Sequence, residues 1–355
     1  MYRDTSKVRI ETTLGATMKF AKFGTTDLMV SRIGFGMWPI GGTIKSGDYG
    51  VTDLDQSILA VQQALDLGIS LFDAAPAYGN GLAEKVLAKG LKGRREDAII
   101  STKCGIYYEF EKKVWIRDSH KEAIIESADQ SLRRLQTDYI DIFLIHWPDD
   151  GTPPESAMDG LLELQKSGKV KYVGVSNFSI PQINTYEKYG ILYAQQVGYN
   201  IFDRRIEGKM LQKCEKSGMG VMGYGSLCHG LLTGVWDEDF RFNKDDWRSQ
   251  GDVFGLQLFT EKNLPINIRV TQKLKKYAQE LGLTLPQLSL AWVMHNPSIA
   301  VGLTGMSTKA EVLENVLAAD AVLSDSDMKK IEEIMKEATG TKQLHKYDFN
   351  DAKKD

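Results

Sequence analysis

The sequence predicts a (β/α)8 TIM barrel, in which eight parallel strands form a closed barrel inside a ring of helices. Short β-branched segments alternate with longer segments of helical spacing through most of the 355 residues. Strict alternation of strands and helices is typical of a parallel sheet. Several short segments, such as DIFLIH and VKYVGVS, are apolar throughout, as strands buried on both faces are. Eight such units in one chain favour a closed barrel over an open sheet.

The first of two less regular segments precedes the barrel. Residues 18–36 have the pattern of a hairpin that leads into the first barrel strand, with its turn at GTT or TTD. The eight barrel strands are then expected at residues 31–36, 69–73, 98–103, 139–146, 170–176, 194–197, 220–224 and 299–303.

The segments between the strands have the apolar stripe of amphipathic helices. The first begins at Thr52 or Asp53, and Ile58, Val61 and Leu65 share one of its faces with Ala64. Glycines at the ends of several helical segments fit the left-handed conformation in which helices often end. These glycines are Gly68, Gly168, Gly218 and Gly282. Further helices are expected at 119–135, 154–167, 205–217, 266–281 and 309–319.

The second irregular segment is a long loop at 235–265, rich in aromatic and charged residues. It follows the seventh strand and therefore lies on the C-terminal face, where barrels carry their active sites. We expect it to cover the substrate; the alternative is a surface insertion without a role.

We expect one domain at residues 18–340, preceded by an extension at 1–17 that need not be ordered and followed by a solvated tail at 341–355. The net charge of −3 gives no reason to expect nucleic acid or an anionic membrane as a partner. The three cysteines are widely spaced, which indicates ordinary thiols and no zinc site. The N-terminus has no signal-peptide pattern and no apolar run could cross a bilayer, so we expect a cytoplasmic protein.

The alternative fold is a Rossmann-type sheet with a second domain, and two patterns could support it. GMGVMG at 218–223 matches the dinucleotide fingerprint, but it lies between a helix and the following strand, the reverse of the required order. Tyr108 and Lys112 match the tyrosine–lysine pair of short-chain dehydrogenases, but no N-terminal glycine-rich turn accompanies them. We interpret both matches as accidental.

Polar residues stand at the C-terminal ends of the predicted strands, where barrel strands bring their side chains together. A single Asp after a strand is usually a helix cap, a single Lys a solvated charge and a single His a half-buried ring. An Asp–Lys pair at the barrel mouth, with a histidine nearby and a tyrosine in the first loop, indicates a site when the residues occur together. The set is Asp73, Tyr78, Lys103, His146, Ser176, Asn177, Gln196 and Tyr224.

These residues lie within eight ordered motifs: IGFGMW, FDAAPAYG, STK, LIHWPD, VGVSNF, QVGYN, YGSL with GLLTG, and VGLTGMSTKAEVLEN. In these motifs the chain resembles the aldo-keto reductase family from about Met18 to about Ala338. The resemblance implies an NAD(P)-dependent oxidoreductase that interconverts a carbonyl and an alcohol. Its partners would be small carbonyl, sugar or polyol substrates, and no oligomeric state is predicted.

The resemblance assigns catalytic roles to four of these residues. Tyr78 would be the general acid in carbonyl reduction and the base in the reverse direction. Lys103 would stabilise the phenolate and lower the tyrosine pKa, and Asp73 would orient the lysine. His146 would donate a hydrogen bond to the substrate oxygen.

The resemblance also implies a site for NAD(P)(H). Ser176, Asn177 and Gln196 would bind the nicotinamide carboxamide, and Tyr224 would stack on the ring. Backbone amides at the start of the helix at Lys309 suit a phosphate. The full set is Met37, Trp38, Asp73, Ser176, Asn177, Gln196, Tyr224, Gly225, Ser226, Leu227, Gly305, Ser307, Lys309, Glu311, Glu314 and Asn315.

Two positions depart from the family pattern. Many relatives have serine and proline after the tyrosine, whereas Gly225 and Ser226 stand there in this chain. NADP-preferring relatives often carry Arg or Lys soon after the glycine equivalent to Gly305, and Arg or Gln six residues on. Glu311 occupies that later position and would repel a 2′-phosphate, although Lys309 would partly compensate. We therefore favour NAD slightly over NADP.

Apolar residues near the barrel mouth are expected to line a substrate pocket with flat walls, suited to sugars or ring carbonyls, or else to pack at the rim. They are Trp38, Ile106, Tyr107, Trp147 and Phe178. A second function remains open, because ion-channel β-subunits share this family's fold and serve as cofactor-binding regulatory subunits. The complete set of Asp73, Tyr78, Lys103 and His146 favours an enzyme.

Overall fold

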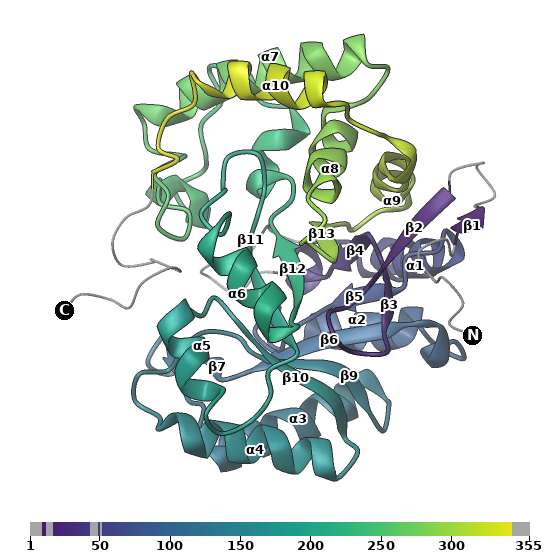
Figure 1. The fold of residues 1–355 in the computed structure, drawn as a ribbon, viewed down its shortest axis with the longest axis vertical. Helices are drawn as coiled ribbons and strands as arrows, with labels where there is room; N and C mark the ends of the chain where they lie inside the picture. The colour runs from purple at the N-terminus through teal and green to yellow at the C-terminus, as the bar shows by residue number, and fades with distance from the viewer. Residues whose placement is uncertain (1–8, 12–16, 43–48, 50–51, 343–355) are drawn as a thin grey trace.

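The computed structural model describes residues 9–11, 17–42, 49 and 52–342, and it confirms the predicted (β/α)8 barrel. Eight strands close into the barrel, each parallel to both of its neighbours (Figure 1). In order around the barrel they are β4 (Ile33–Gly36), β5 (Leu71–Asp73), β6 (Ile99–Cys104), β9 (Ile140–Ile145), β10 (Val170–Ser176), β11 (Ala194–Gly198), β12 (Gly220–Tyr224) and β13 (Val301–Gly305). The predicted strands are shifted by no more than two residues at either end.

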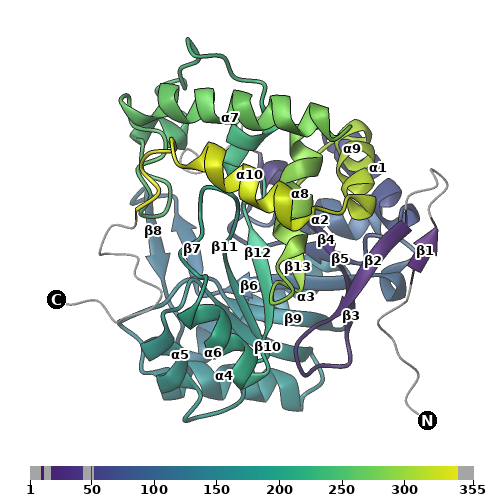
Figure 2. The same cartoon turned by 45° about the horizontal axis from the view of Figure 1, so that its top comes forward.

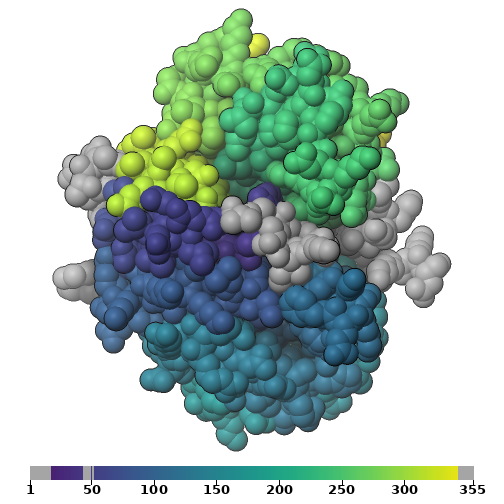
Figure 3. All heavy atoms as spheres, turned by 180° about the vertical axis from the view of Figure 1, so that it is seen from behind, coloured from purple at the N-terminus to yellow at the C-terminus, as the bar shows by residue number. Residues whose placement is uncertain are grey.

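Helices cover the outside of the barrel. In chain order they include α1 (Leu54–Asp66), α2 (Leu82–Gly90), α3 (Lys121–Leu135), α4 (Pro154–Lys166), α5 (Ile180–Tyr186), α6 (Lys209–Ser217), α8 (Leu285–His295) and α9 (Lys309–Val316). Two more, α7 (Asn263–Glu280) and α10 (Asp325–Met335), pack together beyond α8 (Figure 1). In Figure 3, α9 in yellow-green lies against α1 in purple, so the first and last units are neighbours as closure requires.

The first helix shows how local sequence sets these elements. The carboxylate of Asp53 accepts hydrogen bonds from the backbone amides of Asp55 and Gln56 at 3.0 and 3.1 Å, which identifies Asp53 as the cap. Val61 and Leu65 are buried on the inner face. The four glycines expected at helix ends all have φ between 71° and 85°.

The helices missing from the prediction are α2, α5, α8 and α10. Helix α8 is buried at every position from Leu285 to Val293, so it lacks the one-sided stripe on which the prediction depends. Helix α2 begins at Gly81 without a side-chain cap, and α5 has only seven residues. In α10 the single buried residue is Ile331.

The predicted N-terminal hairpin closes the bottom of the barrel. Strands β2 (Thr17–Lys22) and β3 (Met29–Ser31) pair antiparallel, and β1 (Arg9–Glu11) adds to β2 within the expected extension (Figure 2). Phe23 and Val30 are fully buried and join the cluster of apolar side chains that includes Ile142 and Met222. At Gly24, with φ at 56°, a Cβ would lie 2.4 Å from the carbonyl oxygen of Gly218, so the close approach requires glycine.

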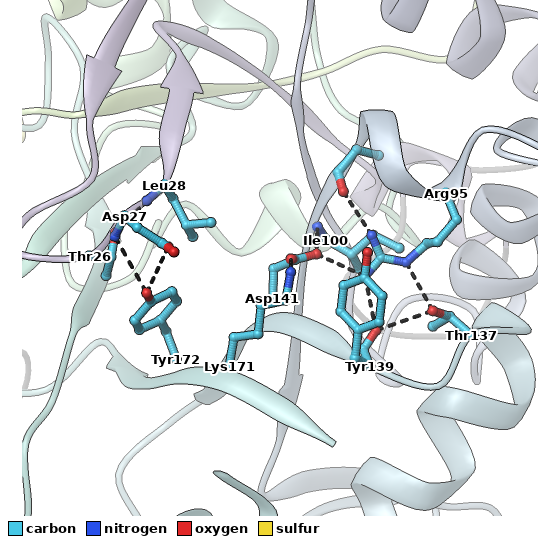
Figure 4. A network of polar contacts seen from close by, with 11 residues as sticks. Thr26, Asp27, Leu28, Arg95, Ile100, Thr137, Tyr139, Asp141, Lys171 and Tyr172 are labelled. Carbon is cyan, nitrogen blue, oxygen red and sulfur yellow. Dashed lines mark hydrogen bonds and ion pairs between the residues drawn. The ribbon is translucent and has the colours of Figure 1, made fainter. Parts of the chain in front are cut away.

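A polar network at the starts of three strands ties the barrel together near this hairpin (Figure 4). Asp141 is 2% exposed and accepts hydrogen bonds from Arg95 at 2.8 Å, Lys171 at 2.9 Å and the amide of Ile100 at 3.0 Å. The guanidinium of Arg95 and the ammonium of Lys171 also lie 4.0 and 4.2 Å from the centre of the Tyr139 ring. The network therefore joins β6, β9 and β10 at the N-terminal end of the barrel.

In the part of the chain that the structure describes, no helix is long and apolar enough to span a membrane. All three cysteines are buried and unpaired, as predicted. The tail expected at 341–355 lies outside the described residues from 343 onward.

Candidate active site

The four predicted catalytic residues meet at the C-terminal end of the barrel. Asp73 ends β5, Lys103 lies near the end of β6, and His146 follows β9 directly. Lys103 Nζ donates to Asp73 Oδ2 at 2.7 Å, to the Ala74 carbonyl at 2.8 Å and to the Tyr78 hydroxyl at 3.2 Å. Rings of Tyr78 and His146 lie edge to face with their centres 5.8 Å apart. The structure thus brings together the residues that three strands and one loop supply.

Asp73 is held from a second side. Its Oδ1 accepts hydrogen bonds from Ser101 Oγ and from Gln196 Nε2, each at 2.8 Å. The carboxylate is 3% exposed, so these bonds and the Lys103 ion pair offset the cost of burying its charge. Asp73 is therefore held in one orientation, and its ion pair holds the ammonium group of Lys103 in place.

Burial has the largest effect on the ionisation of Tyr78 and Lys103. Burial raises the pKa of Tyr78 well above its usual value, and the negative charge of Asp73 raises this pKa further. Burial also lowers the pKa of Lys103, which the carboxylate of Asp73 partly offsets. Burial and the charge of Asp73 thus act against the lowering of the Tyr78 pKa that the resemblance implies for Lys103. Tyr78 is a neutral phenol at neutral pH.

His146 is also neutral. Burial lowers its pKa well below the usual value, and the positive charges of Lys103 and Arg117 act in the same direction. Its Nδ1 is buried and bonds to no group among the described residues. A neutral imidazole can donate a hydrogen bond to a substrate oxygen without competing for the proton of Tyr78.

A cavity of about 470 Å³ opens over these side chains. Trp38, Ile106 and Trp147 line it as predicted, whereas Tyr107 and Phe178 do not. Tyr107 is 47% exposed and faces a separate depression beyond the cavity wall. Phe178 is fully buried and packs edge to face against Tyr186, so it belongs to the core.

The residues expected to bind the nicotinamide lie in the cavity wall beside Asp73 and His146. Ser176, Asn177, Gln196 and Tyr224 all line the cavity. The Tyr224 hydroxyl donates to Asn177 Oδ1 at 2.9 Å, and Asn177 Nδ2 donates to the His146 carbonyl at 3.2 Å. Asn177 has a φ of 63°, an uncommon backbone conformation that these bonds support. The wall is therefore polar and fixed in place.

A groove of about 430 Å³ meets the cavity at four shared lining residues, Pro39, Tyr49, Gly225 and Gly305. Among the predicted cofactor residues, Ser226, Leu227, Ser307 and Glu311 also line the groove. Ser226 Oγ donates to the Leu303 carbonyl at 2.9 Å, so the proton of its hydroxyl is already used in a hydrogen bond to strand β13. Lys309 and Glu314 line neither space, and Met37 and Asn315 are buried.

Glu311 has a specific role in this groove. Its Oε2 accepts hydrogen bonds from the amide of Ser307 at 2.7 Å and from that of Thr308 at 3.0 Å, and it forms a capping box at the start of α9. Two backbone amides directly before the helix at which a phosphate was expected are therefore occupied by a carboxylate of this chain.

Several lining residues were not predicted. The β-hairpin of β7 (Ile106–Glu109) and β8 (Val114–Arg117) contributes Trp115 and Arg117 to the cavity (Figure 2). The long loop at 235–265 contributes Phe254 to the cavity and Arg248 to the groove, as expected of a covering loop. Burial beside Arg248 and Arg205 lowers the pKa of His229, another groove residue, to about 3.

The two connected spaces fit a nicotinamide dinucleotide. The aromatic face of Tyr224 and the amides of Asn177 and Gln196 suit a planar ring with a carboxamide, and each space falls within the usual size range of ligand sites. In the groove, the glycine-containing turn at Gly225 lies beside Arg248, whose guanidinium is paired with Asp246 at 2.7 Å. These residues would hold the ring in the cavity and the phosphates in the groove.

The chain belongs to the aldo/keto reductase family, whose model matches residues 32–336. It is an oxidoreductase of the class that uses NAD(P)H, and solved relatives contain NADPH or NADP.

Among similar proteins, an NADH-specific methylglyoxal reductase of Escherichia coli is 35% identical over 87% of this chain and 96% of its own length. The structure of a glycerol dehydrogenase from Gluconobacter oxydans is 31% identical, covers 90% of this chain and 96% of its own, and has a TM-score of 0.81. A probable voltage-gated potassium channel β-subunit of rice is 28% identical over 90% of this chain and 97% of its own.

Proposed function

We propose that this chain interconverts a small carbonyl compound and an alcohol with NAD(P)(H), and that Tyr78 exchanges the proton. The observation that carries the proposal is the 3.2 Å contact of the Tyr78 hydroxyl with buried Lys103, at a cavity that His146 also lines. The methylglyoxal reductase and the glycerol dehydrogenase among the similar proteins support this reaction class.

A bound nicotinamide supplies or accepts the hydride. In reduction, the neutral phenol of Tyr78 donates a hydrogen bond and then its proton to the carbonyl oxygen. His146 donates a second hydrogen bond to this oxygen. The ammonium of Lys103 stabilises the tyrosinate that results, and Asp73 holds Lys103 in place through the 2.7 Å ion pair. Water then restores the proton of Tyr78.

The substitution Tyr78→Phe tests this assignment. It removes only the hydroxyl, so we expect kcat for aldehyde reduction to fall by about 100-fold or more, the usual size of a general-acid contribution. The dissociation constant of the cofactor, measured by fluorescence titration, should hardly change. Tyr108→Phe is the matched control, because Tyr108 lies outside the cavity and packs against Phe110 and Trp115. Full activity of Tyr78→Phe would place the proton donor elsewhere.

The similarity to channel β-subunits supports a second candidate, a cofactor-binding regulatory subunit. The two functions differ in turnover. Oxidation of NADH and NADPH with a panel of aldehydes, followed by absorbance, decides between them. Tight cofactor retention with no turnover of any carbonyl would favour the regulatory function.

For the cofactor we propose a preference for NAD(H) over NADP(H). A 2′-phosphate at the start of α9 would have to displace the Glu311 carboxylate from the amides of Ser307 and Thr308, or lie beside its charge. Glu311→Gln removes the charge and keeps a side-chain oxygen for the cap. We expect this variant to bind NADPH roughly tenfold more tightly and NADH almost as before, in parallel fluorescence titrations.

Glu314→Gln provides the control, since it makes the same change on the same helix at a side chain that lines neither space. Tighter binding of NADPH than NADH by the unmodified protein would contradict the proposed preference.

A further inference from the structure

We infer that the substrate carries an anionic group, a carboxylate or a phosphate, a few carbons from its carbonyl, and that Arg117 binds this group. This inference rests on the proposed carbonyl chemistry and adds the substrate class. It starts from the charges that line the cavity.

The charges in the cavity wall do not balance. Among the described lining residues, Asp73 and Arg117 are the only two that carry a formal charge at neutral pH. Asp73 is neutralised by its 2.7 Å ion pair with Lys103. No carboxylate among the described residues forms an ion pair with Arg117, so the cavity presents one uncompensated positive charge.

Arg117 is held in position at the cavity wall. It ends β8 and pairs with Ile106 of β7, another lining residue. Its Nη1 donates to the Pro148 carbonyl at 2.9 Å, and its guanidinium lies 5.5 Å from the centre of the Trp147 ring. In the described chain nothing bonds to Nε or Nη2, which leaves two donors for a bidentate contact with a carboxylate or phosphate.

The position of Arg117 limits the length of the substrate. Arg117 bonds to the carbonyl of Pro148, which is the second residue after His146. Backbone geometry places the Cα atoms of Pro148 and His146 within about 7 Å of each other. The Arg117 charge also helps to depress the pKa of His146, so the two side chains are electrostatic neighbours. A carbonyl at Tyr78 and His146 therefore places Arg117 within reach of an anion only a few carbons away.

Two pairs of substrates test the inference, each with an anionic and a neutral member of similar size. They are succinic semialdehyde with butanal, and glyceraldehyde 3-phosphate with glyceraldehyde, assayed with NADH at low ionic strength. We expect kcat/KM to favour the anionic member of at least one pair by roughly five- to tenfold, the size of a charge-assisted contact at an exposed arginine. The preferred pair shows whether a carboxylate or a phosphate is recognised.

Arg117→Met should abolish the preference, chiefly by raising KM for the anionic members. Arg117→Lys should restore part of it, because the charge returns without the planar fork. Arg133→Met, on the exposed face of α3, changes the net charge equally and should keep the full preference. Equal kcat/KM within both pairs, or equal losses for anionic and neutral members in Arg117→Met, would overturn the inference.

A binding measurement separates this inference from the proposed function. In the protein–NADH complex, calorimetric titration with butyrate and with butyramide needs no turnover. Tighter binding of butyrate that Arg117→Met removes supports the anion site even if no aldehyde is reduced. Equal binding of the two ligands counts against it even if Tyr78 proves to be the proton donor.

Discussion

At the scale of single residues, burial and neighbouring charges of opposite sign determine the pKa of Tyr78. A lysine beside a phenol lowers the phenol pKa, and a carboxylate and burial raise it. In this site Asp73 bonds to Lys103 directly at 2.7 Å, and its charge opposes the effect of the lysine on the tyrosine. Burial then prevails and the pKa of Tyr78 rises well above its usual value. Such a tyrosine keeps its proton throughout the neutral range, so it is in the form that carbonyl reduction needs and seldom in the form that alcohol oxidation needs.

This ionisation predicts the pH dependence of the two reaction directions. A raised pKa keeps Tyr78 protonated across the neutral range, so kcat/KM for reduction should stay level from about pH 6 to about pH 9. Alcohol oxidation needs the deprotonated form and should rise steadily with pH over the same range. His146, with its pKa well below the usual value, should add no step near pH 6.5.

The measurement is kcat/KM in each direction against pH in buffers of constant ionic strength. A fall in the reduction rate between pH 6 and pH 8 would contradict this account. It would mean that the histidine titrates near its ordinary pKa despite its burial, or that the tyrosine pKa lies below its ordinary value.

The sequence placed the strand-end residues at the cavity correctly, but two of the predicted pocket residues, Tyr107 and Phe178, do not line it. Ile106 and Tyr107 were both expected in the pocket, but they lie in β7, where successive side chains point to opposite faces. Ile106 lines the cavity with Trp115 and Arg117 of β8, and Tyr107 faces away. The hairpin was absent from the prediction, so the alternation that separates the two residues was absent too.

At the scale of elements, the sequence predicted where the long loop belongs and not how it folds. Its position after β12 follows from the strand order, which places it at the active face. Its contacts depend on aromatic side chains distant in sequence: Trp247 and Phe254 of the loop lie 5.5 and 6.2 Å from Trp38, between ring centres. Such packing has no sequence period, so only the structure reveals Phe254 and Arg248 as lining residues.

At the scale of the whole molecule, the barrel separates its chemistry from much of its polar stabilisation. Asp73, Lys103 and His146 lie at the C-terminal ends of β5, β6 and β9. The Asp141 network lies at the opposite ends of β6, β9 and β10, near the hairpin that closes the bottom (Figure 4). In barrels of this kind, polar residues at the N-terminal face contribute to stability and those at the C-terminal face to catalysis.

Asp141→Asn should therefore destabilise the protein without changing its reaction. The substitution removes the charge that pairs with Arg95 and Lys171 and replaces one of the two acceptor oxygens by an amide donor. Loss of one member of a buried ion pair costs about 3 kcal/mol, so the free energy of unfolding from urea titrations should fall by that order. The values of kcat and KM under native conditions should match those of the unmodified protein. Asp159→Asn, on the exposed face of α4, removes the same charge and should leave the unfolding curve in place. A loss of kcat in Asp141→Asn would show that the two ends of the barrel are coupled and that the separation of stability from chemistry does not hold.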